Sequence, residues 1–152
     1  MQLKNKRSVY LMPMLVCFLG IFSQRAAAST GVYVPDPVTG FVANVQDAAY
    51  GATGDGVSDD TAAIQRAIDA VSAAGGGIVD IPAGNYRINT IYQTGHSYEK
   101  AGLVLKSNII VRIDDGAVLQ AIPNGDRSYQ MFSITHVDNV HIIGGTLIGD
   151  RD

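Results

Sequence analysis

The 152-residue sequence has no tryptophan, one cysteine and a deficit of positive charge. The single cysteine, Cys17, lies in the first apolar run, so the rest of the chain has no thiol for a disulfide or a cysteine metal site. Lysine and arginine total 11, against 14 aspartate and glutamate residues. Because nucleic acid phosphates are bound by clustered cations, this composition excludes nucleic acid as an expected partner.

The first 28 residues have the three parts of a secretory signal peptide. A basic start is followed by an apolar run over residues 11–22 and by three alanines at 26–28, which form a small-residue cleavage pattern. The run of about a dozen residues is too short for the ~20 that a membrane-spanning helix needs. The sequence therefore predicts a signal peptide over residues 1–28 and a secreted protein, extracellular or periplasmic, with no membrane partner after cleavage. Cleavage would remove four cations and no carboxylate, leaving seven basic against 14 acidic residues.

Residues 51–77 read GATGDGVSDDTAAIQRAIDAVSAAGGG, which combines a glycine-rich acidic turn, one amphipathic helix and a triple-glycine exit. Ile64, Ile68 and Val71 recur at helical spacing and give the helix one apolar face. The carboxylates and hydroxyl before them can accept hydrogen bonds from the N–H groups that open a helix. A lone helix followed by short strands is typical of a plug over the end of a strand solenoid. The residues expected to build this cap are Gly54, Asp55, Gly56, Asp59, Asp60, Thr61, Ile64 and Ile68.

The stretch before the acidic turn is predicted to be extended, without a helix. Residues 29–44 contain two prolines and a glycine, which indicates an extended lead-in. Residues 44–50 are expected to form a short edge strand that leads into the turn. The domain proper is expected to cover residues 45–152.

After the helix, one pattern occurs three times: V-x-I-x-x-G-x followed by an aromatic or aliphatic residue. It begins at Val79, Val111 and Val140, in steps of 32 and 29 residues. Alternating residues point inward, the glycine bends the chain, and a unit of this length cannot bury its apolar face alone. The pattern predicts an all-β parallel β-helix of about three rungs with an N-terminal helical cap. The expected internal ladders are Val79, Val111 and Val140 in one, and Ile81, Ile113 and Ile142 in the other.

The run GATGDGVSDDTAAIQRAIDAVSAAGGGIVDIPAGNYRI resembles the N-terminal segment of the pectate-lyase superfamily domain, and LKSNIIVRIDDGAVL and GGTLIGDRD continue the resemblance. The superfamily includes polygalacturonase-type hydrolases, rhamnogalacturonases and mannuronan epimerases. The resemblance implies a right-handed β-helix whose C-terminal rungs are missing here. It also implies action on acidic, uronate-containing polysaccharides such as pectin, by a lyase, a hydrolase or an epimerase. In polygalacturonase-type members the catalytic carboxylates lie further downstream, so none is carried over and the fragment is expected to be inactive alone.

Two carboxylates near the end of the sequence, Asp150 and Asp152, are the catalytic candidates. On a continuing strand they would share a face about 6.6 Å apart. That separation suits acid and base roles in glycoside hydrolysis. The same pair could hold Ca²⁺ against a uronate, which makes Ca²⁺ the one cofactor considered, for a lyase-type reaction. A polar turn without function is the alternative.

Three further groups have both a functional and an ordinary interpretation. Tyr92, His96 and Tyr98 lie in one predicted loop and could contact sugar through flat aromatic faces, or form a solvated loop. The acidic cluster of the turn could bind Ca²⁺, but its spacing does not match a Ca²⁺ loop, and capping is the simpler interpretation. His136 and His141 could suggest a metal site, but two imidazoles without a clear third ligand favour an exposed loop.

The partner expected from all this is an acidic polysaccharide. Because the chain is itself acidic, a polyuronate would be repelled unless calcium or a local basic groove intervenes. A non-catalytic glycan-binding or surface-structural β-helix, like a tailspike or an adhesin, is the alternative. Outward rows of acids and bases would favour the enzyme, and rows of threonine, asparagine or aromatics would favour binding. Oligomerisation or aggregation is expected through the open end of the strand stack.

Overall fold

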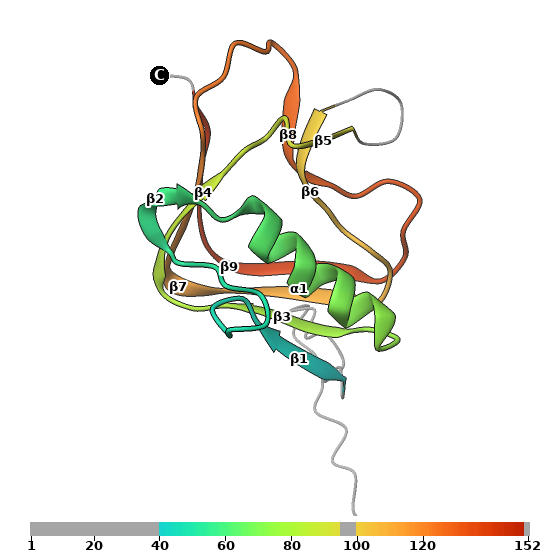
Figure 1. Cartoon of the computed structure of the whole chain (residues 1–152). Helices are drawn as coiled ribbons and strands as arrows, with labels where there is room; N and C mark the ends of the chain where they lie inside the picture. Colours follow the sequence, from blue (N-terminus) through green and yellow to red (C-terminus); the bar gives the residue numbers. More distant parts are fainter. Residues whose placement is uncertain (1–39, 95–99, 151–152) are drawn as a thin grey trace, which may run out of the picture. The chain divides into compact units, whose positions relative to one another are not determined.

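The computed structural model describes residues 40–94 and 100–150 (Figure 1). Within these residues α1 is the one helix, which confirms the expected predominance of strands. No helix in this part of the chain is long and apolar enough to cross a membrane. The predicted signal peptide and most of the lead-in lie outside the described residues. The elements are β1 Phe41–Asn44, β2 Asp55–Asp59, α1 Thr61–Ala73, β3 Gly77–Ile81, β4 Gly84–Ile88, β5 Gln93–Thr94, β6 Lys100–Val104, β7 Ile109–Ala121, β8 Tyr129–Ser133 and β9 Val140–Ile148.

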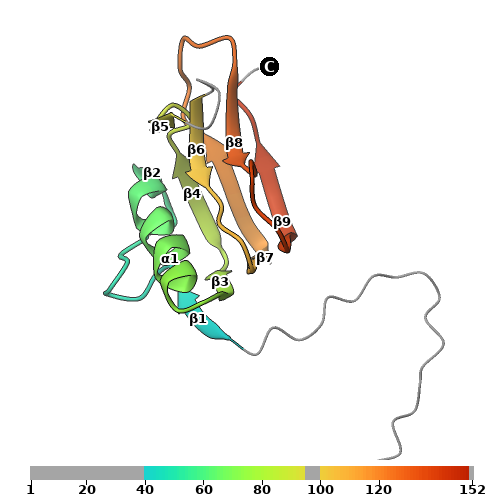
Figure 2. The same cartoon turned by 90° about the vertical axis from the view of Figure 1, so that its right-hand side faces the viewer.

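Most strands pair in parallel with strands from the next stretch of the chain. The long strand β7 bends in its middle, so that residues 109–113 pair with β3 and residues 117–121 pair with β4. Both halves of β7 then pair with β9, and β6 pairs with β8. β1 pairs in parallel with β3, and β2 pairs in parallel with β4. Figure 2 shows the result, in which successive stretches of the chain lie side by side as parallel layers.

The lead-in strand lies earlier than expected. Residues 41–44 form β1, whereas the predicted edge strand at 44–50 is a series of turns. The side chain of Asn44 accepts a hydrogen bond from the Gln46 N–H at 2.9 Å, and the Asp47 N–H bonds to the Asn44 carbonyl at 3.0 Å. These local bonds satisfy the backbone groups that a strand would have paired with a neighbour.

The first predicted step of the internal ladders is confirmed. Val79 lies opposite Val111 and Ile81 opposite Ile113, and these four side chains are buried. Arg112 between them is exposed, as the alternation requires. The second predicted step is wrong by two residues.

In that second step, Val111 lies opposite Ile142, and Val140 lies opposite Ile109. Ile113 lies opposite Gly144 instead of Ile142. A shift of two keeps the same side chains on the inward face, because successive residues of a strand alternate between faces. The error in register therefore does not move an apolar residue out of the core.

After the bend the predicted alignment is wrong by one residue, which does change the face. Tyr86 pairs with Leu119, so Leu119 is the buried residue and Val118 is only half buried. Three residues, 114–116, separate the paired segments in β7, whereas only Pro82 and Ala83 separate β3 from β4. The extra residue in the bend shifts everything that follows it.

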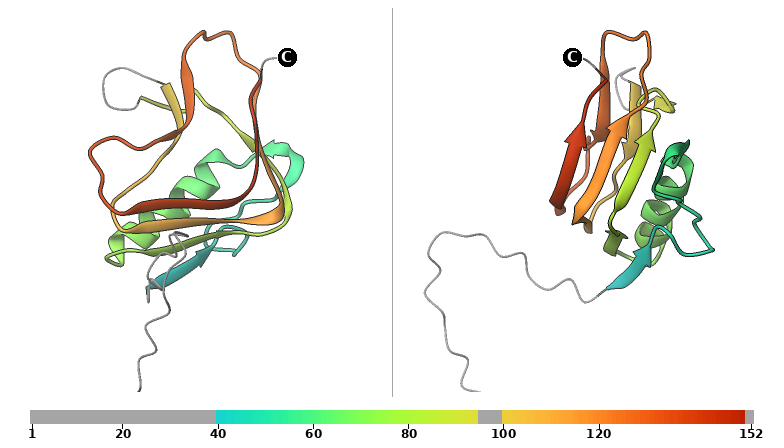
Figure 3. Two further views of the ribbon diagram at one scale, coloured as in Figure 1. Left: turned by 180° about the vertical axis from the view of Figure 1, so that it is seen from behind. Right: turned by 90° about the vertical axis from the view of Figure 1, so that its left-hand side faces the viewer.

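Helix α1 packs against β1, β3, β6 and β7, and it lies on the β3 side of the layers, away from β9 (Figure 3). Ile64, Ile68 and Val71 are fully buried, which confirms the predicted apolar face. Gln65 is also buried, although it is a polar residue outside the apolar spacing of that face. Its amide accepts from the Val104 N–H at 2.9 Å and donates to the Val104 carbonyl at 3.1 Å, so it pairs with the backbone of β6.

Three residues at the acidic turn before α1, Asp59, Asp60 and Thr61, make different hydrogen bonds. Asp59 accepts from the Thr61 N–H at 3.0 Å and so satisfies one donor at the start of the helix. Asp60 makes no capping bond with its side chain, which corrects the expectation that it would. Its buried carboxylate instead accepts from the Thr53 and Gly54 N–H groups, at 2.6 and 3.2 Å. The Thr61 hydroxyl accepts from the Asn89 N–H at 2.7 Å and ties the helix to the end of β4.

Candidate functional site

The outer face of β2, β4, β7 and β9 presents two rows of outward residues. One row runs Asp55, Asn85, Val118 and Thr146, and the other runs Asp59, Arg87, Gln120 and Ile148. Most of these side chains can donate or accept hydrogen bonds. Neither row is a ladder of acids and bases, nor a row of threonine, asparagine or aromatics alone. The rows therefore leave both the enzyme and the binding interpretation open.

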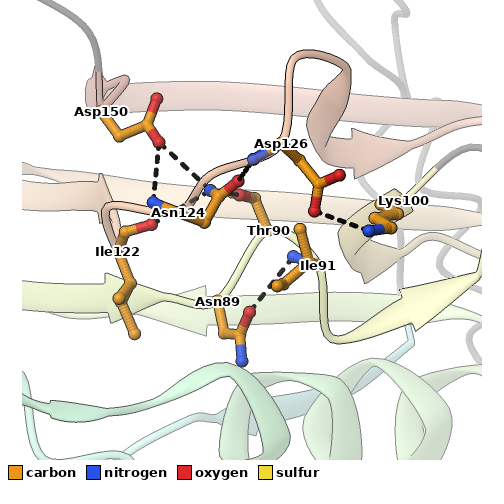
Figure 4. Close-up of polar contacts among 8 residues, drawn as sticks. All are labelled: Asn89, Thr90, Ile91, Lys100, Ile122, Asn124, Asp126 and Asp150. Atoms are coloured by element: carbon orange, nitrogen blue, oxygen red, sulfur yellow. Dashed lines mark hydrogen bonds and ion pairs between the residues drawn. The ribbon is translucent and has the colours of Figure 1, made fainter.

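A column of polar side chains joins the ends of β4, β7 and β9 (Figure 4). The Asn124 amide donates to the Thr90 hydroxyl at 3.1 Å and to the Asp150 carboxylate at 3.2 Å. The Asn124 N–H donates to the same carboxylate oxygen at 3.1 Å. Thr90 is fully buried, and Asp150 and Asn124 are half buried. Three successive stretches of the chain are thus bonded to one another at this corner.

Asp150, one of the two catalytic candidates from the sequence, accepts hydrogen bonds on both of its carboxylate oxygens. The second oxygen accepts a hydrogen bond from the Tyr129 hydroxyl, and that hydroxyl also accepts from the Asp150 N–H at 3.3 Å. These contacts show how Asp150 is held, and they leave its predicted catalytic or calcium role a prediction. Its proposed partner Asp152 lies outside the described residues.

The loop between β7 and β8 is fixed at several points. The Asp126 N–H donates to the Asn124 side chain at 3.0 Å, and the Asp126 carboxylate pairs with the Lys100 ammonium at 2.6 Å. Lys100 begins β6, and Figure 4 shows its side chain next to the Asp126 carboxylate. Next to this loop is a cavity of about 390 Å³ lined by Arg127, Ser128, Tyr129 and Gly149.

A second cavity, of about 420 Å³, lies at the bend between the two halves of β7 and is lined by Asn44, Asp80, Pro82, Arg112, Ile113, Asp114 and Asp115. Arg112 and Asp80 face each other across β7 and β3, with the guanidinium Nε 2.8 Å from the carboxylate. This hydrogen bond raises the pKa of Arg112. The one cation of this cavity is therefore already neutralised by its neighbour, and the remaining side chains are mostly acidic.

The predicted sugar-contacting loop is described only in part. Tyr92 is half exposed, and its N–H bonds to the Asn89 carbonyl at 3.1 Å in a turn after β4. His96 and Tyr98 lie outside the described residues. A role for the three residues in sugar contact stays a prediction.

The two groups that could have suggested a metal site, the acidic turn and the pair of histidines, make hydrogen bonds within the protein instead or lie exposed. Asp55 accepts from the Val57 N–H at 2.8 Å and from the Ser58 N–H and hydroxyl at 2.7 and 2.8 Å. These bonds, led by the one from the Ser58 backbone, hold the pKa of Asp55 at about 2. His141 contacts the Asn139 side chain at 3.2 Å, and His136 is exposed. Over residues 40–94 and 100–150, no group of three or more histidine, cysteine, aspartate or glutamate side chains is placed to hold a metal ion.

Sequence reasoning did not single out Thr90, Asn124, Arg127 or Tyr129. Thr90, Asn124 and Tyr129 act through partners that are distant in the sequence, such as the Asn124 contacts with Thr90 and Asp150. The stretch between the second and third repeats, residues 122–130, is expected to be a loop from the sequence, and this was the one signal that pointed to the region. It gave the place but not the side chains that meet there.

Residues 42–101 match the family model described as rhamnogalacturonase A/epimerase, pectate lyase-like. Mannuronan C5-epimerase AlgE5 of Azotobacter vinelandii is 54% identical over 68 residues, which cover 45% of this chain and 6% of that protein. Alginate lyase 7 of the same organism is 47% identical over 68 residues, which cover 45% of this chain and 7% of that protein.

Among solved structures, the iota-carrageenase of family GH82 from A. fortis aligns with a TM-score of 0.54 at 28% identity, over 70% of this chain and 21% of that chain. The matches span 6% and 7% of the two curated relatives, so this chain corresponds to a small part of their length. These proteins are epimerases, lyases and glycosidases of polysaccharides by name. The resemblance predicted from the sequence is thereby confirmed for residues 42–101, the part of the chain that matches the pectate-lyase-like model.

Proposed function

We propose that this chain is the N-terminal part of a secreted enzyme that cleaves or modifies an acidic, uronate-containing polysaccharide. The observation that carries the proposal is the sequence match to proteins named for their action on mannuronan and alginate. The parallel layers of strands support it (Figure 2), because their outward side chains align in rows that a linear polymer can contact.

The proposed architecture is a right-handed parallel β-helix of about three rungs, with α1 as its N-terminal cap. Support comes from the parallel pairing of β3, β7 and β9 and from the buried apolar face of α1. A cap is needed at such an end because an exposed layer of apolar side chains would otherwise meet water.

The reaction class is argued from the chemistry of a uronate. A lyase or an epimerase must neutralise the carboxylate of the sugar and remove the adjacent proton with a base. A hydrolase instead needs two carboxylates around the glycosidic bond. Asp150 is bonded to Asn124 and Tyr129, which suits a residue that positions a loop. We therefore expect the base and its partners outside residues 40–150, and residues 29–152 alone to be inactive.

A non-catalytic glycan-binding protein is the second candidate. The two outward rows on β2, β4, β7 and β9 are compatible with it as well as with an enzyme, because they carry mixed hydrogen-bonding groups that can contact a sugar polymer. Such a protein would bind the same polymer without changing it.

The test uses the protein as its host exports it, beside purified residues 29–152. Each is incubated with alginate, mannuronan and polygalacturonate, with and without Ca²⁺. Unsaturated ends, reducing ends and C5 inversion by NMR are then measured. We expect the exported protein to convert at least one uronate polymer, and residues 29–152 to bind without conversion. Binding without conversion by the exported protein would favour the second candidate, and an absence of binding would contradict both.

Turnover by monomeric residues 29–152 would contradict the expected inactivity. If Asp150→Asn then abolished that turnover without changing the melting temperature, Asp150 would be catalytic.

Export is tested separately. Residues 1–28 are fused to a phosphatase that is active only after export, beside a control in which two arginines interrupt the apolar run. We expect activity from the first fusion and none from the control. Equal activity from both would contradict the signal peptide.

A further inference from the structure

We infer that the cavity lined by Arg127, Ser128, Tyr129 and Gly149 binds the carboxylate of one acidic sugar unit. The inference rests on the proposed function, since it supplies a local cation for a uronate polymer. A polyanion approaching an acidic chain is repelled except where positive charge is concentrated and unpaired.

Of the described cations, Arg127 is the one that lines this cavity. Lys100 is paired with Asp126, and Arg112 is paired with Asp80. Arg127 is exposed, and it makes no ion pair or hydrogen bond with another described residue. A guanidinium binds a carboxylate through two parallel hydrogen bonds, which gives it an advantage over an ammonium group. Arg127 is thus a cation available for an anionic ligand, beside a cavity that can hold one.

The shape of the cavity depends on Gly149. A Cβ added at this residue would contact the Tyr129 hydroxyl oxygen at 3.9 Å and no other atom nearby. Residue 149 therefore borders open space that a larger side chain would fill. The Ser128 hydroxyl adds a donor at the rim, and the Tyr129 ring offers the flat apolar face on which a sugar ring can pack.

The residues around the cavity hold it in shape before any ligand arrives. Asp150 accepts a hydrogen bond from Tyr129, and Asn124 joins the loop to Asp150 and Thr90. The Lys100–Asp126 ion pair holds the residue next to Arg127. A site fixed in this way loses less conformational entropy when it binds. Asp150 then has a structural reason to be where it is, as a residue that positions the cavity wall.

The cavity also lies where a polymer on the outer face would pass. Gly149 directly follows Ile148, which ends the outward row that contains Arg87 and Gln120. A sugar chain lying along this face would reach Arg127 at the end of the strands. One charged unit would then be fixed there while neighbouring units contact the polar rows.

The test compares charge and shape variants of the full chain by calorimetric titration with short mannuronate oligomers. Arg127→Gln removes the cation of the cavity, and Lys106→Gln removes a cation at the turn between β6 and β7 as the matched control. Gly149→Leu fills the cavity without changing the charge. We expect Arg127→Gln and Gly149→Leu to weaken binding about tenfold or more. Lys106→Gln should change it less than about twofold. Melting temperatures within the range of the wild type show that each variant is folded.

Neutral mannose oligomers and sulfated galactan oligomers of the same length complete the test. We expect the neutral oligomers to bind weakly and without dependence on Arg127, and the sulfated ones to bind less tightly than mannuronate. Equal effects of Arg127→Gln and Lys106→Gln, or tighter binding of sulfated oligomers, would overturn the assignment of this cavity. In those cases the proposed function stands as long as the wild type binds mannuronate. If the wild type binds no uronate, the proposed function itself fails.

Discussion

Asp59 and Asp60 are adjacent carboxylates of the same charge, and their neighbours give them different roles. Asp59 is exposed and accepts from the Thr61 N–H at the start of α1. Asp60 is 2% exposed and organises the turn before β2 through Thr53 and Gly54. The sequence indicates that acceptors are needed here, but it does not show which donor each one meets. That choice depends on how the turn folds back over the helix.

Replacing Asp60 with asparagine tests its role in the turn. Asp60→Asn keeps the size of the side chain but replaces one carboxylate oxygen with an NH₂ group. That NH₂ group faces the N–H donor of Thr53 or Gly54, so one buried hydrogen bond is lost and two donors oppose each other. We expect a loss of about 2–4 kcal/mol in the free energy of unfolding, measured by urea denaturation. Asp47→Asn, at an exposed position, should change it by less than about 0.5 kcal/mol. Equal stability of the two variants would contradict the buried role of Asp60.

Asp55 gives a pH-dependent prediction. The hydrogen bonds from Ser58 and Val57 lower the pKa of Asp55 from 3.8 to about 2. A group with a lowered pKa in the folded state stabilises that state above its unfolded pKa and loses the effect as pH falls through the folded value. We expect the carboxyl resonance of Asp55 to titrate near pH 2, and stability to decline between pH 3.8 and about 2. In Asp55→Asn this part of the decline should be absent. A titration midpoint near 4 would show that the turn is not formed in solution.

At the scale of elements, the sequence predicts what depends on periodicity and misses what depends on bend length. The helix of residues 61–73, its apolar face and the first ladder step follow from spacing within one segment. The second step fails because β7 and β9 turn the same corner with different numbers of residues. Between the paired positions on either side of the corner, β9 has one residue, Gly145, whereas β7 has residues 114–117. The spacing between repeats in the sequence does not show how many residues each strand uses in its bend.

The bend of β9 depends on two glycines. Gly144 and Gly145 have φ values of 78° and 66°, and a Cβ at Gly144 would lie 2.0 Å from the Ile113 carbonyl oxygen. We expect Gly144→Ala to destabilise the protein by about 3 kcal/mol or more, because strain and collision add. The measurements are the free energy of unfolding and the hydrogen-exchange protection of β9. Gly125→Ala, where nothing lies within 4 Å, is the control and should have little effect. Normal protection of β9 in Gly144→Ala would contradict this geometry.

The role of α1 is tested by placing a charge on its buried face. Ile68 is fully buried, so Ile68→Asp would bury a carboxylate without a partner and should cost several kcal/mol. Ala73→Asp, at an exposed position in the last turn, introduces the same charge and should cost less than about 1 kcal/mol. Thermal unfolding followed by circular dichroism compares the two variants. If both melt like the wild type, α1 does not cover the layers as the structure indicates.

At the scale of the whole molecule, the candidate site could be predicted less well than the fold. The cavity at Arg127 is made by the loop after β7 and the end of β9, and that loop is held by Thr90 and Lys100 from other stretches of the chain. Such contacts appear only once successive layers are in register. Because the sequence predicted that register incorrectly for β9, it could not have placed Gly149 beside Tyr129.

The two faces of the layers differ, which leads to the last prediction. On the β3 side α1 covers the apolar side chains, whereas the outer edge of β9 pairs with no described strand. Leu147 is 50% exposed there although it aligns with buried Leu119. An unpaired edge with exposed apolar side chains is a template for association. We expect residues 29–152 to form larger species as concentration rises, measured by sedimentation velocity.

Leu147→Lys should reduce that association, because a charge at a strand edge opposes edge-to-edge pairing. Val57→Lys is the matched control, since Val57 is 85% exposed on β2, away from β9, and gains the same charge. We expect it to associate like the wild type. If both variants reduce association equally, net charge is the cause and the β9 edge is not. If neither does so, association does not depend on Leu147 at that edge.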